Sequence, residues 1–153
     1  MAEVANFYGR TGFAHRLGNV TRDAGFGWNV AAIWNGDHDS IPQTPWEEGD
    51  LLISCHWPRL FPSDLLAAHP HGGLNLHPNL SLGYLVEDPV GRALENGRTM
   101  MSVACHRMEE EADSGDILAE HWRTIPEGSS REYAYELLRP LYESVLREAL
   151  TKL

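Results

Sequence analysis

Apolar and polar residues alternate along several short stretches of the chain, which is the period of a β-strand. The clearest alternation runs over residues 74–78, where Leu74 and Leu76 are interleaved with Asn75 and His77. Side chains two residues apart on a strand leave the same face, so Asn75 and His77 are expected side by side, with the leucines facing a core. Pro78 has no N–H to donate to a neighbouring strand, which predicts that the strand ends there.

The same patterns predict the other elements and, from them, the fold. Strands are predicted at residues 4–8, 28–34, 51–55, 99–106 and 116–124, the last two pairing with each other. Helices are predicted at residues 13–24, 62–68, 88–96 and 129–150, with Ser129 capping the last helix and Pro140 kinking or dividing it. Residues 37–49 have no periodicity and are expected to form a connection. Alternating strands and helices predict one α/β domain over residues 1–153, with a mostly parallel sheet flanked by helices.

Composition narrows the class of protein. The chain has 153 residues, 42% of them apolar, and a formal net charge of −10, which argues against nucleic acid as a main partner. No segment resembles a signal peptide and no apolar run approaches the length of a membrane span, so we expect a cytoplasmic protein without a membrane partner. Cys55 and Cys105 lie in apolar runs, which predicts buried reduced thiols.

Asn75 and His77 are the leading candidates for catalysis. An amide N–H and an imidazole that face one point can hydrogen-bond a developing oxyanion and move a proton. Asp113, in the carboxylate-rich loop 107–116, can orient the imidazole if that loop returns over the strand end. The alternatives are a satisfied polar pair at a strand end and a solvated loop.

Two other interpretations have less support. His69, Pro70 and His71 lack the i, i+4 spacing of a helical zinc pair, and no Cys-x-x-Cys motif is present, so no metal is expected. The glycine-containing loop 9–12 after the first strand can hold an anion at a helix N-terminus, although a simple glycine turn is favoured.

Five segments, taken in order and spacing, resemble the folate-dependent formyltransferase family. The segments are Asp50-Leu51-Leu52-Ile53, Gly73-Leu74-Asn75-Leu76-His77-Pro78, Pro89-Val90-Gly91-Arg92-Ala93-Leu94, Val103-Ala104-Cys105-His106-Arg107-Met108 and Ala112-Asp113-Ser114-Gly115-Asp116-Ile117-Leu118. They are similar to the catalytic domain of glycinamide ribonucleotide, Met-tRNA and amino-sugar formyltransferases. The resemblance implies a Rossmann-like fold.

The resemblance also implies a chemistry and a set of roles. N10-formyltetrahydrofolate would be the formyl donor and a small amine the acceptor, with neither a metal nor a covalent enzyme intermediate. Asn75 and His77 would stabilise the tetrahedral oxyanion, and Asp113 would assist the histidine. The residues that would line the donor pocket, largely through their backbone, are Trp57, Arg59, Leu60, Phe61, Arg107, Met108, Glu110 and Ala112.

The chain departs from the family pattern in two places that concern the acceptor. The loop 79–87 differs from the loop that usually follows the His-Pro pair, and the N-terminal half is one β-α-β unit where relatives have about two. The acceptor is therefore left open among amino sugars, amino acids and biosynthetic intermediates, with a phosphorylated purine-pathway amine not favoured. A formyltetrahydrofolate hydrolase and a catalytically silent folate-binding module remain as alternatives, and the shortened sheet edge makes a homodimer reasonable.

Overall fold

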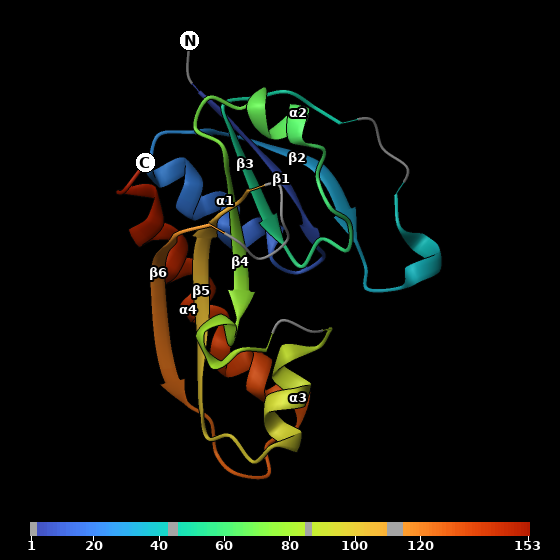
Figure 1. The fold of residues 1–153 in the computed structure, drawn as a ribbon, viewed down its shortest axis with the longest axis vertical. Coiled ribbons are helices and arrows are strands. Elements are labelled where there is room, and N and C mark those ends of the chain that lie inside the picture. Colours follow the sequence, from blue (N-terminus) through green and yellow to red (C-terminus); the bar gives the residue numbers. More distant parts are fainter. Residues whose placement is uncertain (1–2, 43–45, 85–86, 110–114) are drawn as a thin grey trace.

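The computed structural model describes residues 3–42, 46–84, 87–109 and 115–153. These residues form one six-stranded sheet with helices packed against it (Figure 1). The strands are β1 (Val4–Arg10), β2 (Gly27–Trp34), β3 (Leu51–Cys55), β4 (Gly73–Pro78), β5 (Met100–Arg107) and β6 (Ile117–Thr124). The helices are α1 (Ala14–Asp23), α2 (Ser63–Ala67), α3 (Pro89–Glu95) and α4 (Arg131–Leu150), with short 3-10 turns η1 (His38–Ser40) and η2 (Leu80–Leu82).

The sheet is parallel on one side and antiparallel on the other. Its order is β2-β1-β3-β4-β5-β6. The first four strands pair in parallel, β5 pairs antiparallel with β4, and β6 pairs antiparallel with β5. Five of the six described strands therefore point the same way. The predicted α/β fold, the mostly parallel sheet and the pairing of residues 99–106 with 116–124 are confirmed.

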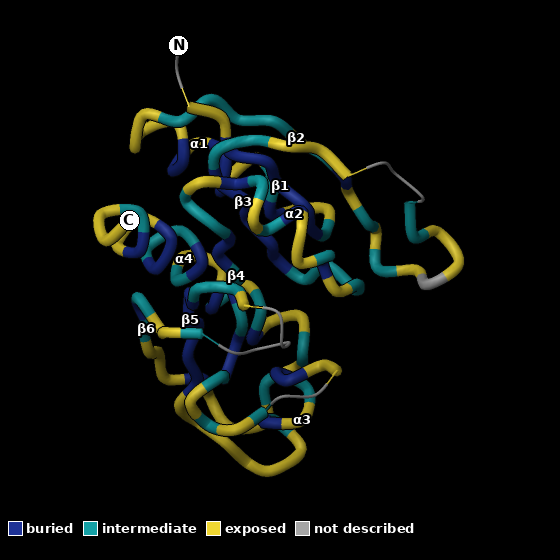
Figure 2. Tube along the Cα trace, turned by 45° about the horizontal axis from the view of Figure 1, so that its top comes forward, coloured by how far each residue is buried: buried dark blue, intermediate teal, exposed yellow. Residues whose placement is uncertain are grey.

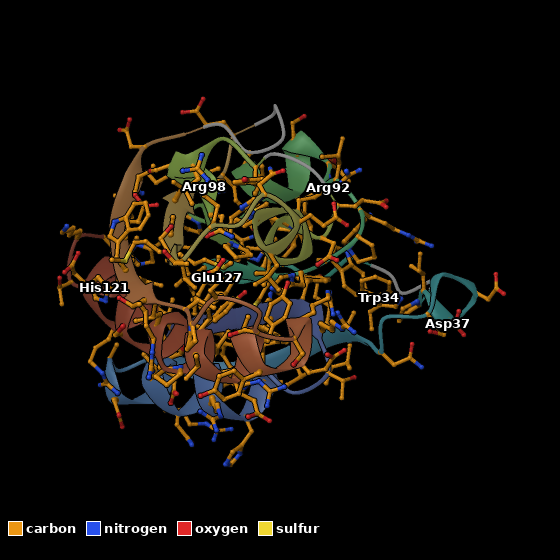
Figure 3. The ribbon with its side chains drawn as sticks, turned by 90° about the horizontal axis from the view of Figure 1, so that it is seen from below. Trp34, Asp37, Arg92, Arg98, His121 and Glu127 are labelled. Carbon is orange, nitrogen blue, oxygen red and sulfur yellow. The ribbon has the colours of Figure 1, made fainter. Side chains whose placement is uncertain are left out.

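One face of the sheet carries the main core because alternate residues of every central strand are apolar. Phe7, Ile53, Leu76 and Val103 are fully or almost fully buried on this face, under α1 and α4. In Figure 2 most of β1, β3 and β5 is coloured as buried, and Figure 3 shows α1 and α4 lying together on one side of the sheet. Cys55 and Cys105 are buried free thiols in the same core, as predicted.

The opposite face is unusually polar for a sheet interior. It presents Asn6, Ser54, Asn75, His77 and His106, which alternate with the core residues along their strands. A smaller apolar cluster covers part of this face; its buried members are Tyr8, Ala32, Leu52, Phe61 and Leu65. This apolar cluster leaves part of the polar face uncovered, and a ligand site can form over the uncovered part.

The connection between β2 and β3 contains only the 3-10 turn η1 among its described residues, in agreement with the absence of periodicity there. Buried Asn6 ties it to the sheet by donating from Nδ2 to the carbonyl oxygens of Glu47 and Glu48, at 3.3 and 3.0 Å. The Tyr8 hydroxyl accepts from the Glu47 N–H at 2.9 Å. The part of this connection that contains Glu47 and Glu48 is therefore held against β1 by hydrogen bonds.

The predicted cap of the last helix is corrected, and of the two outcomes predicted at Pro140 the division is wrong, whereas a kink stays a prediction. The cap is Ser130, whose Oγ accepts from the Tyr133 N–H at 3.1 Å, because Ser129 instead closes the preceding turn onto the Pro126 carbonyl. Pro140 does not divide α4, which runs as one helix from Arg131 to Leu150. Packing accounts for this continuity, since Leu138 and Tyr142 on either side of the proline are buried in the main core. In the part of the chain that the structure describes, no helix is long and apolar enough to cross a membrane.

Candidate active site

A cavity of about 580 Å³ lies over the polar face of the sheet. Side chains from strand ends, from the segment after β3 and from the first turns of α3 and α4 line it. Its lining residues include Arg10, Trp34, Ser54, His56, Trp57, Arg59, Leu60, Phe61, Leu66, Asn75, His77, Glu87, Asp88, His106, Met108, Glu109, Arg131 and Tyr135. The volume falls in the range of small-molecule and cofactor sites.

Asn75 and His77 both line this cavity. They stand two residues apart on β4, half-buried, while their neighbours Leu74 and Leu76 are buried in the core behind them. The predicted strand, its end at Pro78 and the shared face of the two polar side chains are confirmed. Their catalytic roles stay a prediction at this point.

The antiparallel register of β4 and β5 brings His106 directly opposite Asn75. His106 Nδ1 lies 2.9 Å from the Arg107 carbonyl oxygen, which can only accept, so Nδ1 carries the proton. His106 Nε2 is then an acceptor, and Asn75 Nδ2 lies 3.2 Å from it. This contact fixes the amide orientation of Asn75 and leaves its second N–H to point elsewhere.

His77 is oriented in the same manner. Its Nδ1 lies 2.8 Å from the Pro78 carbonyl oxygen and is therefore the protonated nitrogen, so Nε2 carries the lone pair. A neutral imidazole in this tautomer can accept a proton at Nε2. Asp113, the predicted partner of this histidine, lies outside the described residues, as do Glu110 and Ala112.

One part of the cavity is apolar, and we call it the apolar end: Trp57, Leu60, Phe61, Leu66 and Met108. Phe61 and Trp57 pack edge-on against Tyr8, and Leu66 and Met108 belong to the same cluster. The Trp57 indole Nε1–H is buried and has no hydrogen-bond partner among the described residues. A buried donor without a partner is costly, which is typical of a position that a ligand acceptor completes.

The predicted donor-pocket residues divide into two groups. Trp57, Leu60, Phe61 and Met108, together with Arg59, line the cavity. Arg107 is not among the lining residues, because it alternates with His106 on β5 and its guanidinium donates to the Lys152 carbonyl oxygen.

A second part of the cavity, the charged end, consists of Arg10, His56, Asp88, Arg131 and Tyr135. Arg131 Nε donates to Asp88 Oδ1 at 2.6 Å, and its guanidinium lies over the Tyr135 ring at 4.9 Å. Asp88 also caps α3 by accepting from the Gly91 N–H.

His56 is the least expected residue at the charged end. Its φ of 58° lies in the left-handed region, which costs most non-glycine residues about 1–2 kcal/mol. Its Nε2 lies 2.7 Å from the Tyr142 hydroxyl. Burial lowers the pKa of His56 to about 3, and the positive charges of Arg10 and Arg131 act in the same direction. His56 is therefore a neutral hydrogen-bonding group at neutral pH.

The two ends meet along β4. At the start of the strand, a side chain on Gly73 would touch Leu66 and Met108 of the apolar end. Just past its end, Asn79 Nδ2 donates at 3.2 Å to the carbonyl of Pro89, next to Asp88 of the charged end. Asn75 and His77 thus lie between the two ends.

Other chemistries find less support. Burial raises the pKa of Cys55 far above its ordinary value and that of Cys105 to about 12, so neither thiol is an activated nucleophile. Across residues 3–42, 46–84, 87–109 and 115–153, no three His, Cys, Asp or Glu side chains are grouped to hold a metal ion.

Comparison with known proteins gives the family and the fold. The family model "Formyl transferase" matches residues 35–150. A methionyl-tRNA formyltransferase of Listeria welshimeri is 30% identical over 103 residues, which are 67% of this chain and 33% of that protein. This chain thus matches about a third of the length of such curated relatives.

Two solved structures have the same fold at low sequence identity. Glycinamide ribonucleotide transformylase 1 from Symbiobacterium toebii superposes with a TM-score of 0.76 at 18% identity, over 98% of this chain and 86% of that one. A formyltetrahydrofolate deformylase from Pseudomonas syringae gives 0.74 at 15% identity, over 98% of this chain and 60% of that one. Since the family model covers most of the sequence, this chain belongs to the formyl transferase family.

Proposed function

We propose that this protein transfers the formyl group of N10-formyltetrahydrofolate to the amine of a small metabolite. The observation that carries the proposal is the position of Asn75 and His77, side by side in one cavity between an apolar end and a charged end. Membership of the formyl transferase family supports the choice of formyl transfer over other reactions of an amide and an imidazole.

The two side chains suit the two needs of the reaction. As the amine nitrogen attacks the formyl carbon, the electron pair of the carbonyl moves to its oxygen and a tetrahedral intermediate forms. The N–H of Asn75 that does not face His106 donates to this oxyanion. His77 Nε2 accepts the proton that the attacking nitrogen must lose and passes it to N10 of the folate, which leaves as the carbonyl reforms. Asp113 is proposed to assist His77 in this proton movement.

The apolar end fits the flat ring system of a folate. Trp57, Phe61 and Met108 offer aromatic and sulfur-containing surfaces, and the unpartnered Trp57 Nε1–H offers a donor to a heteroatom of the ring. The donor pocket would include Arg59 and Leu60, and the backbone of Arg107, Glu110 and Ala112, as the family resemblance implies. No metal takes part in this proposal.

One experiment separates the proposal from its alternatives. The protein is incubated with N10-formyltetrahydrofolate alone and with a panel of amine metabolites, and both tetrahydrofolate and formate are measured. Amine-dependent tetrahydrofolate release without formate is expected. Formate release without any amine would indicate a hydrolase instead, and binding without turnover would indicate a silent folate-binding module.

A further inference from the structure

We propose that Arg10 binds an oxyanion, a carboxylate or a phosphate, on the amine acceptor, so that the substrates are anionic amines. This inference rests on the proposed function and adds the chemical class of the acceptor. Its basis is a positioned guanidinium that faces the cavity and has no carboxylate partner among the described residues.

The fold holds Arg10 in place before any ligand binds. Arg10 is the last residue of β1 and pairs in register with Trp34 of β2. Its guanidinium carbon lies 6.0 Å from the centre of the Trp34 ring. A Cβ on Gly36 would lie only 2.7 Å from Arg10 Nη2, so the glycine leaves the space that the guanidinium fills. A restrained arginine loses little rotamer entropy when it binds an anion.

Trp34 is itself anchored. Its indole Nε1–H donates to the Asp37 carbonyl oxygen at 2.6 Å. Figure 3 shows the two residues together at the edge of the molecule, where the chain leaves β2 for η1. The Trp34 ring beside Arg10 is therefore held both by β2 and by the turn that follows it.

The charge of Arg10 is not neutralised within the described part of the chain. No carboxylate oxygen lies within 4.0 Å of it there, whereas Arg131 pairs with Asp88 at 2.6 Å and Arg16 pairs with Glu143 at 3.2 Å. Asp88 is already engaged by Arg131 and by the cap of α3. A half-buried guanidinium that lines a cavity without a counter-ion favours an anionic ligand.

The position of Arg10 relative to His77 fits a short acceptor. Gly9 of β1 pairs with Cys55 of β3, and Cys55 pairs with Leu76 of β4, so Arg10 and His77 are the next residues on strands two apart. Two strand spacings are about 10 Å. An amine whose anionic group lies a few bonds from its nitrogen can reach both residues.

His56, which follows Cys55 of β3, lines the same cavity and does not compete for the anion. Its low pKa leaves it uncharged at neutral pH, so Arg10 keeps the positive charge at this side of the cavity. As a neutral group, His56 can still hydrogen-bond the body of the acceptor.

The test is equilibrium binding in the absence of any formyl donor. Three probe amines, β-alanine, 2-aminoethyl phosphate and 3-aminopropanol, are titrated into the full chain and followed by NMR of the Arg10 side-chain N–H and the Trp34 indole N–H. The first two carry a carboxylate and a phosphate, and the third is the neutral control. We expect at least one anionic probe to bind more tightly than 3-aminopropanol; the one that binds tighter identifies the kind of anion.

Variants assign the binding to Arg10. In Arg10→Gln the affinity for the anionic probe should fall about 10- to 100-fold, the usual range for a charge-assisted hydrogen bond, and Arg10→Lys should recover part of it. Arg16→Gln, which removes an exposed arginine of α1 outside the cavity, should bind as the wild type does. Thermal melts of all three variants check that each remains folded.

Two results would overturn the inference: no preference of the wild type for either anionic probe, or equal affinities in Arg10→Gln and Arg16→Gln. Because no formyl donor is present, a failure of formyl transfer in the turnover assay leaves this outcome unaffected. The two failures are therefore distinguishable.

Discussion

The two ends of the cavity differ in how the fold builds them. The apolar end is made by residues close in sequence, Trp57 and Phe61 after β3 and Leu66 on α2, with Met108 added from the end of β5. The charged end is assembled from Arg10 on β1, Asp88 before α3 and Arg131 at the start of α4, which are far apart in the chain.

This difference suggests a division of labour. A compact segment attached to one strand suits recognition of a donor that does not vary, because residues close in sequence can be retained together as one unit. Strand and helix ends from distant parts of the chain can vary separately, which suits recognition of an acceptor that differs between relatives. Asn75 and His77 lie between the two ends and would serve both molecules.

The largest effects are expected at this junction. Removing one preorganised oxyanion donor typically costs about 3–4 kcal/mol of transition-state stabilisation. Asn75→Ala or His77→Ala should therefore lower turnover on the order of 100- to 1,000-fold, measured as tetrahydrofolate release. His71→Ala is the control, since this histidine lies on the surface beside Glu3. Turnover within tenfold of the wild type in both variants would contradict the assignment.

A smaller and more selective effect is expected at the apolar end. Leu60 is 69% exposed yet lines the cavity, so it has apolar surface to offer a ligand and little role in the core. Leu60→Ala should raise the donor KM about tenfold through the lost burial of its side chain, with an unchanged melting temperature.

Ile117→Ala, a comparable truncation at an exposed position on β6, serves as the control. If both variants leave the donor KM unchanged, or if Leu60→Ala raises only the acceptor KM, the apolar end does not hold the donor.

The smallest effect concerns the charged end and the stability of the fold. His56 is neutral in the folded protein, with a pKa of about 3, whereas in the unfolded chain its pKa is near 6.5. The unfolded state therefore binds the proton first as the pH falls, and stability is lost below about pH 6.5. This residue alone should cost about 1 kcal/mol by about pH 5.5.

His56→Asn, whose new side chain tolerates the left-handed backbone, should remove that part of the pH dependence. Urea unfolding of the wild type and the variant, each at pH 7 and at pH 5.5, measures the difference. His71→Asn is the control at a half-buried histidine that pairs with Glu3 on the surface. Equal losses of stability in the wild type and in His56→Asn would show that His56 is not held neutral by the fold.

Local sequence patterns were sufficient for much of the fold. The period-two alternation at Leu74–Pro78 placed Asn75 and His77 on one face. Similar local patterns along the chain distinguished the strands of the sheet from the helices that cover it. The cap of α4 was predicted wrongly because a contact outside the helix decides which serine caps it. Ser129 and Ser130 are both good caps, and only the turn onto Pro126 shows which one begins α4.

The rest of the candidate site depends on contacts between distant residues. His106 lies within a strand that was predicted from its local pattern, but its pairing with Asn75 follows from the antiparallel register, which no local pattern specifies. Arg131 gave no signal at all, and Arg10 was noted only as part of the loop 9–12, because each is an ordinary charged residue until the sheet and α4 bring both to one cavity. A cytoplasmic location, a homodimer and the role of Asp113 stay predictions.

The most direct test of the two-ended cavity is an NMR titration with N10-formyltetrahydrofolate. Trp57 reports on the apolar end and Trp34 on the charged end, and each has one indole N–H resonance. The donor should shift the Trp57 indole signal in a saturable manner as its N–H gains a partner, and should leave the Trp34 signal in place. A shift of the Trp34 signal with the Trp57 signal unchanged, or no shift of either, would contradict the account.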